Sequence, residues 1–90
     1  MSRYYLVEAG FPYVTLLTAH EATELFESVS PDCRQGSLNA GFRYWRLLEN
    51  GLGQLIRFPV MKVSPIPDDQ ISAVCERFSP FITLPKGLAP

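Results

Sequence analysis

The stretch that decides the fold is "YWRLLENGLGQLIRF", residues 44–58, in which aromatic, basic and apolar side chains are interrupted once by Asn50-Gly51. Asn-Gly between two apolar runs is a strong signal for the turn of a β-hairpin. Gly51 also suits the residue just past the end of a helix, where a left-handed backbone is common. A hairpin favours a small α+β binding module, whereas a helix followed by a strand favours a DNA-binding domain.

Helical periodicity is the better match to residues 38–50. Ser37 can cap the helix, and at 100° per residue one side of it carries Leu38, Gly41, Phe42, Trp45 and Leu48. A second side carries Asn39, Arg43, Arg46 and Asn50. In the hairpin alternative Trp45 would pair with Ile56 and Tyr44 with Arg57, which mixes apolar and charged side chains on both faces. We therefore predict a helix over 38–50, although Gly41 costs about 1 kcal/mol there.

The other elements follow from local signals. Residues 2–9 and 13–17 read as strands, and Thr18 with Glu21 has the capping-box spacing that opens a helix over residues 19–29. Residues 54–58 and 60–63 read as short strands, and Asp68 or Asp69 begins a closing helix. Its apolar stripe consists of Ile71, Val74, Cys75 and Phe78. We expect one α+β domain over residues 1–90, with its core in 16–78 and an extended, proline-containing tail over 79–90.

Composition narrows the functional classes. The chain has 90 residues, 47% hydrophobic and 19% charged, without an apolar run long enough to span a membrane or a secretory signal, so we expect a cytoplasmic protein. Two cysteines and one histidine are too few for a structural zinc site, so we expect no metal and no cofactor. The sequence contains neither a phosphate-binding loop nor a nucleophile elbow, and we do not expect an enzyme.

The formal net charge of −1 hides an uneven distribution. Residues 1–33 carry one basic against five acidic residues, a charge of −4, whereas residues 34–62 carry five basic against one acidic, a charge of +4. A positive middle third is a candidate contact surface for a polyanion or for an acidic protein.

After the leading strand, the order helix, helix, strand, strand, helix resembles the winged-helix domains of the excisionase and MerR-type family, whose basic pattern does not include that leading strand. "LLTAHEATELF" is similar to their first helix, and "YWRLLENGLGQLIRF" to their second helix and following strand. "PIPDDQISAVCERF" is similar to their closing helix. The resemblance covers roughly residues 16–78, but the connector between the first two helices is longer than in the family. The wing, "FPVMKV", has Lys62 as its single basic residue.

This resemblance implies a winged-helix-like fold and non-catalytic binding of double-stranded DNA, with the second helix in the major groove. It also implies a recombination directionality factor or transcriptional regulator that works with a site-specific recombinase. A 90-residue module buries too little surface for high specificity alone, so a homodimer or a cooperative array is expected. The candidate DNA-binding residues are Asn39, Arg43, Tyr44 and Arg46 for bases, with Arg34, Arg57 and Lys62 for phosphates.

The alternative is a small α+β protein-binding module, an inhibitor or adaptor. In this hypothesis the basic segment 34–62 contacts an acidic surface on a partner protein. Whether Asn50-Gly51 lies at a helix end or in a hairpin separates the two hypotheses, because a hairpin removes the recognition helix.

Overall fold

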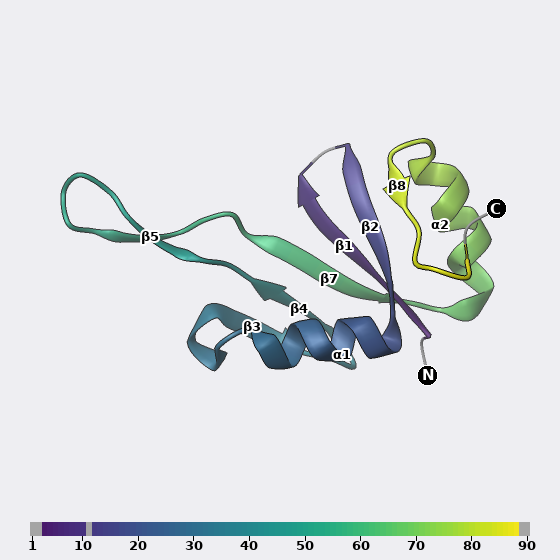
Figure 1. Ribbon diagram of the computed structural model, residues 1–90, viewed down its shortest axis with the longest axis horizontal. Helices are drawn as coiled ribbons and strands as arrows, with labels where there is room; N and C mark the ends of the chain where they lie inside the picture. Colours follow the sequence, from purple (N-terminus) through teal and green to yellow (C-terminus); the bar gives the residue numbers. More distant parts are fainter. Residues whose placement is uncertain (1–2, 11, 89–90) are drawn as a thin grey trace.

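The computed structural model, which describes residues 3–10 and 12–88, shows a six-stranded sheet from which a two-stranded arm projects (Figure 1). The strand order in the sheet is β3-β4-β7-β1-β2-β8, and every pair of neighbours is antiparallel except β2 and β8. The strands are β1 (Tyr4–Gly10), β2 (Tyr13–Thr18), β3 (Arg34–Ser37), β4 (Gly41–Tyr44), β7 (Met61–Ile66) and β8 (Ile82–Thr83). The arm consists of β5 (Leu47–Glu49) and β6 (Leu55–Arg57).

One helix packs on each face of the sheet. Helix α1 (Ala19–Ser28) packs on the face to which Tyr5 and Val7 of β1 point, and helix α2 (Ile71–Phe78) packs on the opposite face, over Leu6. Strand side chains alternate between faces, so one apolar strand supplies both cores. The core under α1 contains Tyr5, Val7, Ala22, Phe42 and Val63, and the core under α2 contains Leu6, Val14, Leu16 and Ile66.

The predicted first helix is confirmed, ending one residue earlier than expected. The Thr18 hydroxyl accepts a hydrogen bond from the Glu21 backbone N–H at 3.2 Å, and the Thr18 N–H donates to the Glu21 carboxylate at 2.9 Å. These are the two bonds of a capping box, which satisfy backbone donors that the helix leaves free. The two predicted leading strands are also confirmed as β1 and β2, although residue 2 of the first lies outside the described residues.

The predicted helix over 38–50 is wrong: this segment forms β4 and β5. Gly41 has φ +102°, which a right-handed helix excludes. Ser37 does accept a hydrogen bond from the backbone three residues ahead, at Ala40 (3.1 Å), but the bond closes the turn between β3 and β4 instead of capping a helix. Pairing of Phe42 with Val63 of β7 then buries Phe42 beneath α1, an option that local periodicity does not reveal.

The arm is a β-hairpin, as in the alternative to the predicted helix, but its strands pair in a different register. Leu47 pairs with Arg57 and Leu48 with Ile56, three positions away from the register that a two-residue Asn50-Gly51 turn would impose. Asn50 closes a longer turn: its side-chain oxygen accepts from Leu52 N–H at 2.8 Å and from Gln54 N–H at 3.1 Å. The positive φ lies at Gly53 (+76°) rather than at Gly51, as expected for a three-residue hairpin loop.

The winged-helix-like prediction is therefore wrong as a whole. The order helix-helix-strand-strand-helix does not occur, because the second helix is replaced by strands of a mixed sheet. The predicted wing is also absent from the described residues, since β6 pairs with β5 whereas β7 pairs with β1 and β4.

The closing elements follow the prediction more closely. A 3-10 turn, η2 (Asp68–Gln70), leads into α2, whose Ile71, Val74, Cys75 and Phe78 pack on the core. The tail continues as β8 beside β2, and Leu84 and Leu88 also pack there; residues 89–90 of the predicted tail lie outside the described residues. Among the described residues, neither helix is long and apolar enough to cross a membrane.

We predict that Gly36 is required for folding. An added Cβ at Gly36 would lie 2.5 Å from the carbonyl oxygen of Gly41, and the φ of +104° is itself unfavourable for other residues. Gly36→Ala should lower the free energy of unfolding by about 1–3 kcal/mol, measured by urea denaturation. Gly51→Ala is the matched control, because nothing lies within 4 Å of a Cβ there, and its stability should not fall.

Candidate functional site

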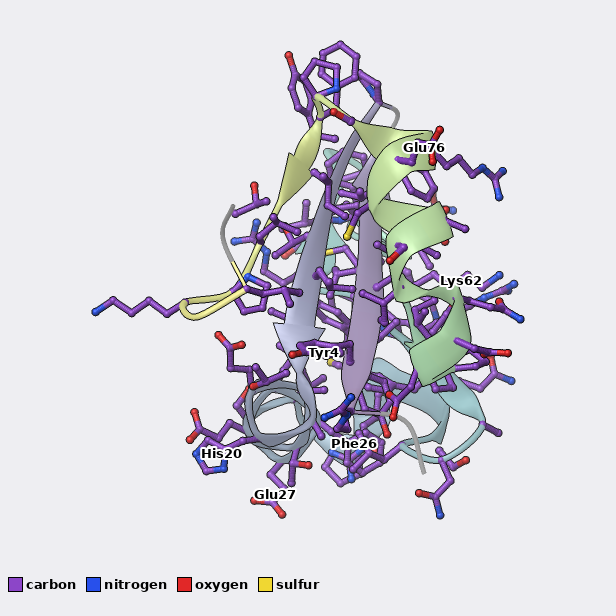
Figure 2. The ribbon with its side chains drawn as sticks, turned by 90° about the vertical axis from the view of Figure 1, so that its right-hand side faces the viewer. Tyr4, His20, Phe26, Glu27, Lys62 and Glu76 are labelled. Atoms are coloured by element: carbon purple, nitrogen blue, oxygen red, sulfur yellow. The ribbon has the colours of Figure 1, made fainter. Side chains whose placement is uncertain are left out.

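Part of the sheet is left uncovered on the face that carries α2. The core beneath α2 draws its buried residues from β1, β2 and the Ile66 end of β7, and none of them comes from β3 or β4. Alternation along β7 places Lys62 and Ser64 on this face, because Val63 between them points to α1. Figure 2 shows Lys62 on the side of α2, whereas Phe26 and Glu27 belong to α1 on the other side.

A shallow depression of about 330 Å³ lies on this uncovered face. The Cα positions of Gln35 and Arg43 are paired between β3 and β4, and those of Arg43 and Lys62 between β4 and β7. Three polar side chains are thereby placed in one row across three strands. We call the depression the basic hollow; it is lined by Gln35, Gly36, Ala40, Gly41, Phe42, Arg43, Lys62, Val63 and Ser64.

Two glycines let the backbone pack closely beneath the basic hollow. Gly36 lies directly against the backbone of Gly41 and Phe42, which leaves no room for a side chain. At Gly41 a Cβ would lie 3.1 Å from the Val63 carbonyl oxygen and 3.4 Å from Pro65. The two glycines therefore allow the strands beneath the basic hollow to pack closely against one another.

Arg43 and Lys62 are like charges in register, and neither has an ion-pair partner within residues 3–10 and 12–88. Both side chains are exposed; among the described residues, Arg3 pairs with Asp68 at 3.1 Å, and His20 Nε2 lies 2.6 Å from a Glu24 carboxylate oxygen. Glu8 is in register with Lys62 on the β1 side but forms no ion pair with it within 4 Å. Like charges opposite each other destabilise a sheet, so the free protein gains nothing from this pair.

Arg34, predicted to contact phosphate, stabilises α1 instead. Its guanidinium donates to the carbonyl oxygens of Phe26, at 3.0 Å, and of Val29, at the C-terminal end of the helix. The Arg34 Cζ atom also lies 4.1 Å from the centre of the Phe26 ring. A cation over exposed helix carbonyls is a structural arrangement, and it keeps this guanidinium away from a ligand.

The remaining predicted DNA contacts are dispersed. Arg57 stacks on Trp45, with 4.2 Å from Cζ to the ring centre, and Arg46 is exposed at the base of the arm. Tyr44 is half-buried, with its ring centre 6.0 Å from that of Phe42, and burial raises the pKa of its phenol. Asn39 lies in the turn between β3 and β4.

Of the seven predicted residues, the structure brings together Arg43 and Lys62. The predicted helix face that carried Asn39, Arg43 and Arg46 does not exist, because these residues belong to a turn, a strand and the arm. Sequence reasoning missed Gln35 and Ser64 in the basic hollow and the two glycines beneath them. The signal that could have found them is the pairing of Arg34–Ser37 with Gly41–Tyr44 around a three-residue turn, which the helical reading of 38–50 concealed.

The arm and its base form a second surface. The arm, residues 46–58, exposes the apolar side chains Leu47, Leu48, Leu52, Leu55, Ile56 and Phe58. A groove of about 570 Å³ lies where the arm meets the end of α1, and we call it the arm-base groove. It is lined by Ser28, Val29, Ser30, Cys33, Tyr44, Trp45, Arg46, Leu47, Leu48 and Met61. The buried Trp45 Nε1 has no hydrogen-bond acceptor in the part of the chain that the structure describes.

Comparison of the chain with protein-family models, with curated proteins and with solved structures finds no match. Within residues 3–10 and 12–88, no group of three or more His, Cys, Asp or Glu side chains could hold a metal ion. The thiols of Cys33 and Cys75 are free and half-buried.

We predict that the arginines divide into structural and free groups. Arg34→Ala should lower the free energy of unfolding by about 1–3 kcal/mol, because it removes charged hydrogen bonds to the carbonyls at the end of α1. Arg43→Ala should change it by less than about 0.5 kcal/mol, because that side chain is exposed and unpaired. Chemical denaturation of both variants checks this, and equal losses would contradict the division.

Proposed function

We propose that this protein is a small, cytoplasmic, non-catalytic protein-binding module, an inhibitor or adaptor, whose basic hollow docks on an acidic surface of a partner. The supporting observation is the unpaired, in-register arrangement of Arg43 and Lys62 on an uncovered sheet face. A carboxylate placed between them would offset the repulsion that the free protein retains.

The chemistry of the basic hollow suits a carboxylate-rich surface. Arg43 can bind a carboxylate through two parallel hydrogen bonds, and Lys62 adds a second positive charge beside it. Gln35, at one end of the row, and Ser64, two positions along β7 from Lys62, supply neutral donors and acceptors.

A protein partner is favoured over DNA for two reasons. The recognition helix on which the DNA hypothesis depended is not present, and Arg34 and Arg57 are engaged in stacking within the protein. The basic hollow itself holds two basic side chains, Arg43 and Lys62, on a chain with a net charge of −1, whereas nucleic-acid-binding domains concentrate many more.

Binding can be tested with a labelled acidic peptide of alternating glutamate and leucine, followed by fluorescence anisotropy across a salt series. We expect salt-sensitive binding that Arg43→Gln/Lys62→Gln weakens at least about tenfold, because each variant removes a charged contact. Arg77→Gln/Lys86→Gln is the matched control: it changes the net charge equally at two exposed positions outside the basic hollow and should bind like wild type.

A labelled mixed-sequence DNA duplex is titrated in parallel. DNA binding that decreases with salt and is lost in Arg43→Gln/Lys62→Gln would move the assignment of the basic hollow to nucleic acid. An absence of binding to both probes at low salt, or equal losses in the two double variants, would overturn the proposal.

A further inference from the structure

We propose that the arm is a self-association element through which two copies of this chain pair. The two arms lie antiparallel about a two-fold axis, and the tip of each arm fills the arm-base groove of the other copy. This inference is independent of the proposed function, because the arm and the arm-base groove share no residue with the basic hollow.

The chain exposes more surface than a compact monomer of its size. Its accessible area is 6382 Å², whereas a mass of 10.1 kDa corresponds to about 5,300 Å². The radius of gyration of 14.3 Å likewise exceeds the roughly 12 Å expected for such a chain. The excess of roughly 1,100 Å² per copy is close to the ~800 Å² per partner that a standard interface buries. Figure 1 shows that the arm extends away from the body of the molecule.

The arm is apolar where an isolated hairpin should be polar. Leu52 at the tip is 83% exposed, Leu55 67% and Phe58 60%. A two-stranded ribbon has no second layer of structure that could bury these side chains. Such ribbons are only marginally stable alone in water. Contiguous exposed apolar side chains of this kind mark an interaction surface.

The spacing of residues along the arm indicates that the tip of a second copy of this chain occupies the arm-base groove. If the two-fold axis passes beside the pair Leu48–Ile56, Leu52 lies four residues from it toward the tip. Tyr44 lies four residues from it in the other direction, and it lines the arm-base groove. The two residues lie on opposite sides of the axis at the same separation in sequence, so antiparallel arms bring the tip of one copy toward the groove of the other. An isologous interface requires this self-complementarity.

The charges on the arm match the same arrangement. Leu47, Glu49, Leu55 and Arg57 point to one face of the ribbon, because cross-strand pairs share a face. Glu49 lies one position toward the tip from the axis and Arg57 one position toward the base. In antiparallel arms Glu49 of one copy therefore lies level with Arg57 of the other, twice in the dimer, whereas parallel arms would bring like charges to the same level.

The arm-base groove offers what an apolar tip requires. Val29, Trp45, Leu47 and Met61 supply apolar lining, and the volume of about 570 Å³ is ample for a leucine side chain. Trp45 also brings the buried Nε1–H that has no acceptor among the described residues. A backbone carbonyl of the turn at Gly51–Gly53 is a suitable acceptor, and such a bond would remove the cost of the unsatisfied donor.

Sedimentation equilibrium over a concentration series tests the pairing. Wild type should be a dimer that dissociates on dilution. Leu52→Asp/Leu55→Asp should weaken the dimer at least about a hundredfold, because a two-fold interface loses each contact twice. Tyr13→Asp is the matched control: Tyr13 is 68% exposed at the far end of the β1–β2 hairpin, and its substitution should leave the dimer unchanged.

Arm exchange can be tested directly by disulfide trapping, because Cys33 lines the arm-base groove. In a Cys75→Ser background, Leu52→Cys places a thiol at the tip. Diamide, which accepts the two electrons and two protons of the thiols, should then join it to Cys33 of a second copy. We expect a covalent dimer on non-reducing gels, with this cross-link identified by peptide mapping, and its loss in Leu52→Cys/Cys33→Ser.

Three outcomes would overturn the proposal. Wild type that stays monomeric at every concentration removes the dimer, and a dimer that Leu52→Asp/Leu55→Asp does not weaken places the interface elsewhere. A Leu52→Cys thiol that joins only its counterpart in the second copy would contradict insertion of the tip into the groove. Circular dichroism of each variant separates loss of pairing from loss of folding, because the arm contributes no residue to either buried core.

Discussion

Strand β1 is the element on which the rest of the structure depends, since it is paired along both edges and covered on both faces. Its edges pair with β2, which follows directly in the chain, and with β7, which begins more than fifty residues later. Tyr5 and Val7 enter the core beneath α1, and Leu6 enters the core beneath α2. Apolar residues on both sides of one strand thus require two covering layers, and the order of the helices along the chain places one on each face.

The basic hollow is a consequence of that division. Helix α2 has only eight residues and covers β1, β2 and one end of β7, whereas the sheet continues to β4 and β3. The strands beyond the reach of α2 carry polar side chains on that face and glycines where the backbone approaches closely. Arg34, one position before Gln35, points to the other face and closes the end of α1. Because neighbouring side chains of a strand point to opposite faces, Arg34 stabilises α1 while Gln35 lines the basic hollow.

The arm differs from the sheet in how it is stabilised. Its backbone hydrogen bonds form within the arm, whereas its apolar side chains have no neighbouring layer on which to pack. Asn50 organises the turn through its own side chain, and the ladder of β5 and β6 requires no help from the sheet. The apolar side chains of the arm gain nothing from that ladder in the isolated chain. In the proposed dimer a second copy buries these apolar side chains, and the basic hollow stays free for a different partner.

The sequence by itself determined the elements whose signals are local. The capping box at Thr18 and Glu21, the aromatic and branched residues of β1 and β2, and the apolar stripe of α2 are each visible within a few positions of the sequence, and each was predicted. Of the candidate site, Arg43 and Lys62 were identified as residues but placed on a helix and a wing that do not exist. Only the tertiary structure decided residues 38–50, because spacings of three and four among Leu38, Phe42, Trp45 and Leu48 fit a helix as well as a bent strand. Pairing of β4 with β7 buries Phe42 and Val63 together, and that long-range burial outweighs the local helical preference.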